Sequence, residues 1–324
     1  MQPLNVLVTG ATGFVGAALL QYLKGHDDFN PIGAVRADIK KHYADDIERV
    51  NIGNISAKTD WSHALQGTNV IVHTAGRAHI LKESSDNALA EFRAINVEGT
   101  LNLAKQAITA GVSRFVFISS IKVNGEETLP NQPFSEDILK PPIDAYGLSK
   151  YEAECALYAL AKNTTMDVVI IRPPLVYGPG VKANFLNLMK GLHKGLPLPL
   201  GAVHNFRSLV AIENLVNFIA VCITNPSAAN QTFVVSDGND LSTTKLLVLL
   251  GRALGRPARL LPIPTSWLYF AAGLMGKKSV AQRLCGNLQV DIRKATKVLN
   301  WCPPVTVEAA LQNTASSFLT LKVK

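Results

Sequence analysis

Residues 4–16 of this chain read LNVLVTGATGFVG, an apolar run that stops at a cluster of glycines and continues with helical spacing. The apolar run is rich in β-branched residues, which is typical of a strand buried on both faces of a parallel sheet. Gly10, Gly13 and Gly16 recur at every third position, where glycine permits a tight turn, close approach of the backbone to a pyrophosphate, and close helix packing. The stretch predicts a strand, a phosphate-binding turn and a helix, although a glycine-rich turn of an unrelated α/β protein shares the pattern.

The overall composition is that of a globular protein with a basic surface. A length of 324 residues favours one large α/β unit with an appended lobe over two independent domains. Because 48% of the residues are hydrophobic and only 17% are charged, we expect no disorder. The formal charge is +8, but the 32 Lys and Arg residues are scattered rather than clustered. A generally basic surface, or an anionic small-molecule substrate, explains this charge better than nucleic acid, so we expect no nucleic-acid partner.

The cysteine pattern predicts neither a metal site nor a disulfide framework. The chain contains neither a CxxC pair nor a regular cysteine spacing, its cysteines being Cys155, Cys222, Cys285 and Cys302. We therefore expect reduced, buried thiols in a cytoplasmic protein. No charged-then-apolar leader precedes the first strand, which agrees with that expectation.

The most apolar later stretch, residues 267–275, reads WLYFAAGLM. It is much shorter than the ~20 residues that a membrane-spanning helix needs, so we expect no stable insertion into a membrane. A core helix of the second lobe is the favoured interpretation. The alternative is contact with a membrane surface, because Lys277 and Lys278 follow directly.

Strand-like and helix-like patterns alternate along the first half of the chain. Strands are expected at residues 4–8, 31–35, 50–55, 69–73 and 115–118, with helical patterns between them. Such alternation with short connections predicts an α/β fold with a doubly wound parallel sheet, whose ligands bind at the carboxyl ends of the strands.

The residue that follows the second expected strand, 31–35, indicates whether the cofactor is NAD or NADP. In a dinucleotide-binding fold this position lies beside the adenosine ribose, where an acidic residue favours NAD and an arginine favours NADP. Arg36 follows the strand and favours NADP(H). Two alternatives stay open: the nearby Asp38 could favour NAD instead, and Arg36 could be an ordinary surface residue. Asn54, at the end of the third expected strand, is a candidate neighbour of the adenine.

The fourth expected strand runs into small residues. Thr74, Ala75 and Gly76 would let the backbone lie against a cofactor. His73, just before them, is a possible catalytic residue, although a histidine packed beneath the cofactor loop is the favoured interpretation. A long helical pattern follows and contains Asn96.

Two groups of polar residues carry the chemistry expected at this edge of the sheet. Ser119 and Ser120 end the fifth strand, and Tyr146 and Lys150 are spaced to lie one turn apart on one helix face. An ammonium beside a phenol favours the phenolate, so we expect Lys150 to lower the pKa of Tyr146 and make it an acid/base. The pattern Tyr-x-x-x-Lys is common by itself and gains weight from its context.

The chain resembles the extended short-chain dehydrogenases/reductases, in particular the nucleotide-sugar epimerase family, over essentially its whole length. The resemblance is carried by TGATGFVG at 9–16, HTAG at 73–76, NVEGT at 96–100, SSIKVNG at 119–125, YGLSK at 146–150 and RPPLVYGPG at 172–180. It implies that Ser120 is the catalytic serine, Tyr146 the acid/base, and Lys150 the residue that tunes Tyr146 and holds the nicotinamide ribose.

The resemblance also implies the domains and the remaining site residues. Residues 1–172 would form a Rossmann-type NAD(P)-binding domain, with strands returning near 206–212 and 232–236, and 173–324 mainly a substrate-binding lobe. The cofactor residues would be Gly10, Thr12, Gly13, Phe14, Val15, Gly16, Arg36, Asn54, Ile55, Thr74, Ala75, Gly76, Asn96, Tyr146, Lys150 and Pro173. The substrate residues would be Ser120, Lys122, Asn184 and Arg207, with Arg207 pairing with a diphosphate. Each of three substrate residues has an alternative interpretation. Lys122 could be a solvent-facing lysine, Asn184 a helix cap, and Arg207 an ordinary surface arginine.

Two related activities at C4 of a UDP-hexose-type substrate agree with these residues: 4-epimerisation, and reduction of a 4-keto sugar by NADPH. Dehydration is disfavoured, because Ser120-Ile121-Lys122 replaces the Thr-Asp-Glu of sugar-nucleotide dehydratases. More distant alternatives are an NADPH-dependent reductase of an apolar ketone and a non-catalytic cofactor-sensing protein. The resemblance further implies a homodimer formed through the helices that hold Asn96 and Tyr146.

Overall fold

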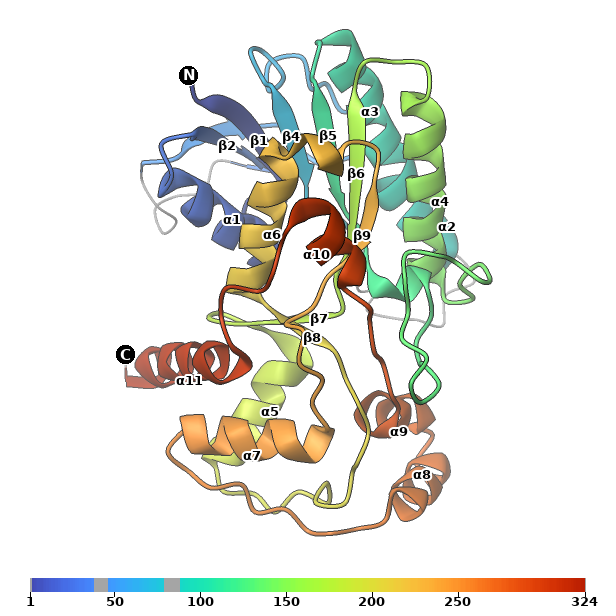
Figure 1. Cartoon of the computed structure of the whole chain (residues 1–324), viewed down its shortest axis with the longest axis vertical. Helices are drawn as coiled ribbons and strands as arrows, with labels where there is room; N and C mark the ends of the chain where they lie inside the picture. Colours follow the sequence, from blue (N-terminus) through green and yellow to red (C-terminus); the bar gives the residue numbers. More distant parts are fainter. Residues whose placement is uncertain (1, 38–45, 79–87, 324) are drawn as a thin grey trace.

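The structure, a computed structural model, describes residues 2–37, 46–78 and 88–323 (Figure 1). A sheet covered by helices on both faces stands over a smaller lobe, and the carboxyl ends of the strands point toward that lobe. Asp38, the possible acidic alternative to Arg36, lies outside the described residues.

A seven-stranded parallel sheet forms the first unit. Its strand order is β3-β2-β1-β4-β5-β6-β9, and each pairing is parallel. The strands are β1 (Leu4–Thr9), β2 (Phe29–Val35), β3 (Glu48–Asn51), β4 (Val70–His73), β5 (Arg114–Ile118), β6 (Asp167–Arg172) and β9 (Thr232–Val234). The order reverses between β1 and β4, which is where ligands bind in doubly wound sheets. The predicted fold class is confirmed.

Helices cover both faces of this sheet. The helices α1 (Phe14–Lys24) and α6 (Ile212–Thr224) pack on one face, and α3 (Thr100–Thr109) and α4 (Ala145–Ala161) on the other. Side chains of β1 alternate between the two: Val6 and Val8 pack with α1 and α6, whereas Leu7 packs with α3 and α4. This burial on both faces explains the nearly continuous apolar run of the strand.

Two strand predictions are wrong. The third strand ends at Asn51 instead of residue 55, because Gly53 has a φ of +64° that an extended strand does not permit. The segment 206–212 does not return to the main sheet. Its strand β8 (Leu209–Ala211) pairs with β7 (Leu175–Tyr177) in a separate two-stranded sheet, since Pro173 and Pro174 end β6 and carry the chain beyond the main sheet.

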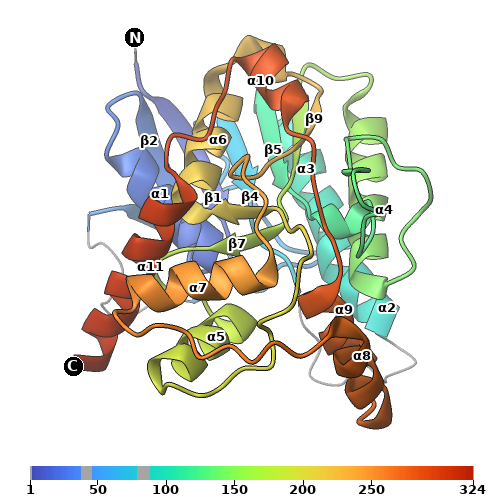
Figure 2. The same cartoon turned by 60° about the horizontal axis from the view of Figure 1, so that its bottom comes forward.

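The lobe has a core of its own. Apolar side chains of α5 (Ala183–His193), α7 (Thr243–Ala253) and α11 (Val307–Val323) pack there together with β7 and β8. Figure 2 shows α5 and α7 side by side, with α8 (Thr265–Leu274) and α9 (Lys278–Cys285) at the other end of the lobe. The remaining helical segments are α2 (Ala88–Arg93), η1 (Ala94–Gly99), η2 (Ile121–Val123), η3 (Pro226–Ala228) and α10 (Arg293–Leu299). The domain boundary at residue 172 stays a prediction, with α6, β9 and α10 lying on the side of the sheet.

The prediction that residues 267–275 form a buried core helix is wrong about burial. The helix forms as α8, but Trp267, Phe270 and Leu274 are 69%, 67% and 77% exposed. The helix is apolar around its circumference, so only one side, which includes Leu268 and Ala272, is packed inward. Within the described residues, no helix has the length and apolar character required to cross a membrane.

The cysteines are unbridged, as expected, but not all are buried. Cys222 is buried, whereas Cys155 and Cys302 are exposed, so the expectation of buried thiols is wrong for these two. The described residues contain no group of His, Cys, Asp and Glu side chains arranged to hold a metal ion.

Candidate active site

The turn between β1 and α1 is packed so closely that it requires glycine. A Cβ at Gly10, whose φ is +70°, would lie 2.6 Å from Oγ1 of Thr74. A Cβ at Gly16 would overlap the carbonyl oxygen of Gly10. Gly13 donates its N–H to that carbonyl at 2.8 Å and precedes the first residue of α1. The first-turn N–H groups of a helix, here those of Phe14 and Val15, have no acceptor within the helix and suit an anion.

The loop after β4 is tied to this turn through Thr9. Oγ1 of Thr74 donates to the carbonyl oxygen of Thr9 at 2.7 Å, and the N–H of Ala75 donates to Oγ1 of Thr9 at 3.3 Å. Nδ1 of His73 lies 2.7 Å from the same Oγ1, and its Nε2 lies 3.0 Å from Oγ1 of Thr100. Burial, with Lys150 nearby, lowers the pKa of His73 to about 3. His73 is therefore a neutral residue beneath the loop, and the favoured interpretation is confirmed.

The positions assigned to the adenosine part of a cofactor lie along the same edge. Arg36 follows the last residue of β2 and is exposed. Asn54 and Ile55 lie in the loop after β3, where Asn54 is exposed and the Ile55 side chain packs against Gly99. The structure thus places all three near the carboxyl ends of β2 and β3, as expected for residues that contact the ribose and the adenine.

Asn96 lies on a π-helical turn that had no sequence signal. This turn, η1, interrupts the helical stretch between α2 and α3, and such turns are frequent at functional sites. Oδ1 of Asn96 accepts the N–H of Arg77 at 2.8 Å, while Nδ2 donates to the carbonyl oxygen of Arg77 and to Oγ of Ser149. The buried amide thus joins the loop after Gly76 to α4. It holds the cofactor loop in position and has its hydrogen bonds within the protein.

Ser120 and Tyr146 meet as the sequence predicted. Ser120 follows β5 and Tyr146 lies in the first turn of α4, and the Ser120 side chain lies near enough to act on the pKa of the Tyr146 phenol. The Tyr146 ring also packs edge-on against Phe92, with 5.8 Å between the ring centroids. Burial raises the pKa of Tyr146 to about 12, the nearby Ser120 hydroxyl acts in the opposite direction, and the Asp144 carboxylate adds to the rise.

Lys150 is buried one turn further along α4. Its Nζ donates to the carbonyl oxygen of Ile118 at 2.9 Å and lies 4.4 Å from the centroid of the Phe117 ring. A Cβ at Gly76 would lie 3.3 Å from this ammonium, so Lys150 borders the cofactor loop. Burial lowers the pKa of Lys150 to about 8, opposed by the carboxylate of Glu154. The expectation that Lys150 lowers the pKa of Tyr146 is wrong for the protein alone, because burial dominates.

The start of α4 is fixed by residues that the sequence did not single out. Asp144 caps the helix by accepting the N–H of Gly147 at 3.0 Å. A Cβ at Gly147 would lie 2.7 Å from the carbonyl oxygen of Lys122, so glycine lets α4 approach the turn after Ser120. Nζ of Lys122 lies 3.4 Å from Asp144 and 2.8 Å from Glu126. The substrate-binding role expected of Lys122 stays a prediction; here it supports the cap of the helix that carries Tyr146.

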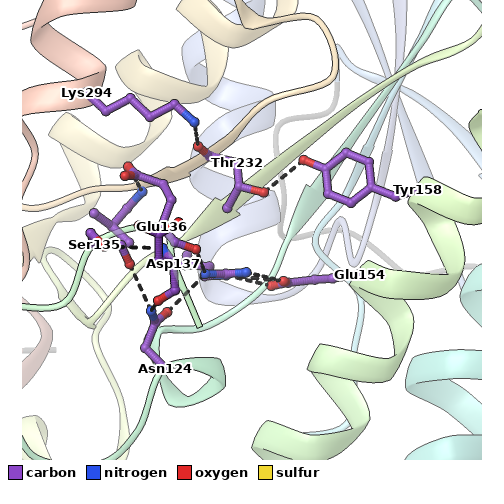
Figure 3. A network of polar contacts seen from close by, with 10 residues as sticks. Asn124, Ser135, Glu136, Asp137, Glu154, Tyr158, Thr232 and Lys294 are labelled. Atoms are coloured by element: carbon purple, nitrogen blue, oxygen red, sulfur yellow. Dashed lines mark hydrogen bonds and ion pairs between the residues drawn. The ribbon is translucent and has the colours of Figure 1, made fainter. Parts of the chain in front are cut away.

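A buried ion pair fixes the other side of α4 (Figure 3). Arg172, at the end of β6, lies 2.6 Å from Glu154 of α4 and donates to Oδ1 of Asn124 and the carbonyl oxygen of Glu136. Asn124 in turn donates to the carbonyl oxygens of residues 135 and 137. Its amide joins the segment after Ser120 to the loop before α4.

The last expected cofactor residue and two expected substrate residues lie on different elements. Pro173, expected at the cofactor, is buried after β6, and its carbonyl oxygen accepts the N–H of Ile121 at 3.0 Å. Asn184 is exposed in the first turn of α5. Arg207 is partly buried, and its Nη1 donates to the carbonyl oxygen of Gly286 at 3.0 Å. Burial lowers the pKa of Arg207, while Glu127 and Tyr269 act in the opposite direction.

The segment that holds Arg207 is joined to the catalytic edge. Its backbone pairs with Leu288, and Leu288 packs in one apolar cluster with Ile121, the residue after Ser120. The serine and the arginine are therefore connected through a single packed cluster. The structure brings Ser120, Tyr146 and Lys150 together at the sheet edge and places Arg207 on the adjoining face of the lobe.

Comparison with known proteins agrees with this arrangement. Among curated relatives, the UDP-glucose 4-epimerase of Vibrio cholerae is 49% identical over 319 residues, 98% of this chain and 96% of that protein. The N-acetyl-alpha-D-glucosaminyl-diphospho-ditrans,octacis-undecaprenol 4-epimerase of Escherichia coli O157:H7 is 29% identical over 332 residues, covering 96% of this chain and 94% of that protein. Among solved structures, the UDP-glucuronic acid 4-epimerase of Bacillus cereus in complex with UDP-glucuronic acid and NAD has a TM-score of 0.78 at 21% identity, covering 98% of this chain and 100% of that chain.

The comparisons confirm the resemblance inferred from the sequence motifs. Residues 6–236 match the family described as the NAD dependent epimerase/dehydratase family, which is more than half of the chain. The chain therefore belongs to the NAD dependent epimerase/dehydratase family.

Proposed function

We propose that this enzyme is an NAD(P)-dependent nucleotide-sugar 4-epimerase. The observation that carries the proposal is the placement of Ser120 and Tyr146 together at the carboxyl edge of the sheet, with buried Lys150 one helical turn along α4 and bonded to the end of β5. The 49% identity to a UDP-glucose 4-epimerase supports a UDP-hexose as the substrate. Arg207 would pair with its diphosphate, since a guanidinium offers paired donors to phosphate oxygens.

The residues at the sheet edge fit a dinucleotide cofactor. Backbone N–H groups of the turn at 10–16 suit the pyrophosphate, and Lys150 beside Gly76 suits the nicotinamide ribose. The hydroxyl of Ser119 is buried and has no hydrogen-bond partner among the described residues, which agrees with a polar ligand at this edge. When bound, the nicotinamide supplies the acceptor and donor of hydride for C4 of the sugar.

The residues of this chain then move and position one proton. Tyr146 takes the proton of the C4 hydroxyl and later returns it. The cycle would have no net redox change because the hydride removed from C4 is also returned to it. Ser120 hydrogen-bonds the C4 oxygen and keeps it oriented toward the Tyr146 phenol. Lys150 supplies a buried positive charge next to the cofactor loop, which favours the charged states that form during the reaction.

A 4-keto-reductase is the second candidate, favoured by Arg36. This exposed arginine after β2 suits the 2′-phosphate of NADP, and a reductase must exchange its cofactor at every turnover. We therefore also propose a preference for NADP(H). Cofactor that stays bound through many turnovers supports the epimerase, whereas one NADPH oxidised per 4-keto sugar supports the reductase.

A lipid-linked sugar diphosphate is a second candidate substrate. The name of the Escherichia coli relative gives a sugar joined through a diphosphate to undecaprenol. The exposed apolar side chains of α8, which also carries Tyr269 near Arg207, favour this possibility. A lipid-linked substrate would place its diphosphate at Arg207 just as a UDP-sugar would.

A homodimer through the outer faces of the helical segment α2–η1–α3, which holds Asn96, and of α4, which holds Tyr146, is also proposed. Cys155 and Ala159 are small, exposed residues on α4, while Ala153 and Leu157 pack inside the subunit. Light scattering of wild type is expected to give a dimer and of Ala159→Arg a monomer, because a long charged side chain cannot be buried in a close helix contact. A monomeric wild type would contradict the proposal.

The activity is tested by incubating the protein with UDP-glucose and either NAD or NADP, and following the C4 epimer by proton NMR. Tyr146→Phe is expected to lose activity by about a hundredfold or more, since proton transfer by a side chain contributes about that much. Tyr151→Phe, on the same helix, is the matched control and should keep its activity. Lack of turnover of UDP-hexoses and of their 4-keto forms by wild type would overturn the proposal.

A further inference from the structure

The exposed apolar side chains of α8 lie together on one side of the helix. Trp267, Phe270, Leu274 and the following Met275, here called the α8 face, are spaced so that they lie along one side. Figures 1 and 2 both place α8 at the outer end of the lobe, away from the sheet. Four large apolar side chains exposed together on one helix form an interaction surface rather than scattered exposure.

The sequence around this face is basic and contains no acidic residue. Residues 241–290 include no Asp or Glu but seven Lys and Arg: Lys245, Arg252, Arg256, Arg259, Lys277, Lys278 and Arg283. All seven are exposed. The stretch therefore has a formal charge of +7, against +8 for the whole chain. Although basic residues are scattered in the sequence, this part of the lobe has no acidic residues to balance them.

Acidic groups border this region on its inner side. Asp240 accepts from Nε2 of Gln289 at 2.7 Å, and Glu127 lies against α9. The Glu127 carboxylate accepts from Nε2 of Gln282 on α9 at 3.0 Å and lies next to Gly286. It is thus engaged on the inner side of α9, toward Arg207. Lys277 and Lys278, which follow the α8 face in the chain, remain exposed.

We propose that the α8 face and the basic start of α9 form a peripheral docking site for an anionic membrane surface. Exposed Trp and Phe beside lysines are typical of helices that lie in the interface between lipid headgroups and acyl chains. Trp267, Phe270 and Leu274 enter that boundary, and Lys277 and Lys278 contact lipid phosphates. Contact at the surface is all that a ten-residue helix can make, because a spanning helix needs about 20 residues.

Charge favours a lipid surface over a second copy of this chain. Pairing two copies through the same face would bring two regions of charge +7 together, which is unfavourable. An anionic bilayer supplies both the apolar boundary and the opposite charge. Docking would also bring the part of the lobe around Arg207 close to the membrane, since Tyr269 of α8 lies near enough to influence the pKa of that arginine. Access to a lipid-linked substrate rests on the proposed function. Docking itself does not rest on it.

The three tryptophans make this proposal directly measurable. Trp61 and Trp301 are buried, whereas Trp267 is exposed. Addition of vesicles of phosphatidylcholine with phosphatidylglycerol to the full-length protein is expected to shift its tryptophan emission to shorter wavelength, and brominated lipids are expected to quench it. Trp267→Ser should lose both responses. Vesicles of phosphatidylcholine alone should bind at least about tenfold more weakly, and added salt should weaken binding to the anionic vesicles.

Flotation with the same vesicles tests the residues separately. Phe270→Ser and the double variant Lys277→Glu/Lys278→Glu are each expected to weaken binding by about tenfold or more. Leu139→Ser, at a leucine outside α8 that is even more exposed than Phe270, and Lys24→Glu/Lys105→Glu, with the same change of charge, are the matched controls and should float like wild type. Circular dichroism and Tm confirm that each variant is folded.

The outcomes that overturn docking are distinct from a failure of the proposed enzyme. Wild type that does not float with anionic vesicles, or variants and controls that float equally, would exclude docking through α8. A change of oligomeric state in Phe270→Ser would assign the face to a second copy instead. The vesicles carry no sugar substrate, so loss of the proposed activity leaves these results unaffected.

Discussion

Nη2 of Arg172 lies 2.6 Å from Oε2 of Glu154 in an ion pair whose side chains are 4% and 3% exposed. The pair joins the end of β6 to the catalytic helix α4 and lies one helical turn beyond Lys150. Loss of one partner of a buried pair leaves an uncompensated charge, which is strongly destabilising.

Glu154→Gln is therefore expected to lower the free energy of unfolding by about 3 kcal/mol. Urea denaturation followed by circular dichroism measures this change. Glu152→Gln, also on α4, is the matched control. It breaks the exposed ion pair of Glu152 with Arg93 of α2 and should leave the free energy of unfolding nearly unchanged. Equal effects of the two substitutions would contradict the assigned role of burial.

Lys150→Met should separate stability from activity. Burial lowers the pKa of Lys150 from 10.5 to about 8, so the folded state binds fewer protons than the unfolded state between these values, and holding the charge at pH 7 costs stability. Methionine removes that cost, and the variant is expected to be about 1–2 kcal/mol more stable at pH 7, the lost hydrogen bond to Ile118 offsetting part of the gain. Turnover should be lost. A variant less stable than wild type in urea would contradict this balance.

Ser120→Ala should affect both rate and pH dependence. The Ser120 hydroxyl lowers the pKa of Tyr146, which burial raises to about 12. Without it the pKa rises further, so the ascending limb of the pH–rate profile, which reports the phenolate that accepts the C4 proton, should move to higher pH. The rate at neutral pH should fall by roughly a hundredfold, as for other losses of one orienting donor. An unchanged profile would show that Ser120 does not act on the Tyr146 phenol.

His73 should make stability fall in acid. Its pKa is about 3 in the folded state and 6.5 without the fold, so the unfolded state binds more protons between these values. The contribution is complete above pH 6.5 and is lost as pH falls toward 3. Wild type is expected to lose about 2–3 kcal/mol from this group between pH 7 and pH 4.5. Urea denaturation at several pH values should show a smaller loss for His73→Gln, and an equal loss in both proteins would assign the acid sensitivity to other groups.

Arg36→Asp should change the choice of cofactor. The exchange removes the guanidinium expected to pair with the 2′-phosphate and adds an acceptor for the 2′-hydroxyl of NAD. Fluorescence titration is expected to show at least about tenfold weaker binding of NADPH and equal or tighter binding of NADH. Lys24→Asp, an exposed cation on α1, is the control. Equal weakening for both cofactors would show that Arg36 does not contact the ribose phosphate.

Local sequence was sufficient to predict the parallel sheet, the glycine turn after β1 and a helix with Tyr146 and Lys150 one turn apart. Strand periodicity, the spacing of glycines in a turn and the spacing of residues along one helix are all properties of a few neighbouring residues. The atoms that leave no room for a Cβ at Gly10, by contrast, belong to Thr74 and Ala75, which are distant in sequence.

Tertiary structure alone decided the features that depend on partners distant in sequence. The pairing of β8 with β7, the link from Asn96 to Arg77 and Ser149, and the ion pair of Arg172 with Glu154 each join segments from different parts of the chain. The raised pKa of Tyr146 follows from burial, which spacing along a helix does not reveal. The exposure of α8 has the same origin, since an apolar helix is buried only where the fold supplies a surface to cover it.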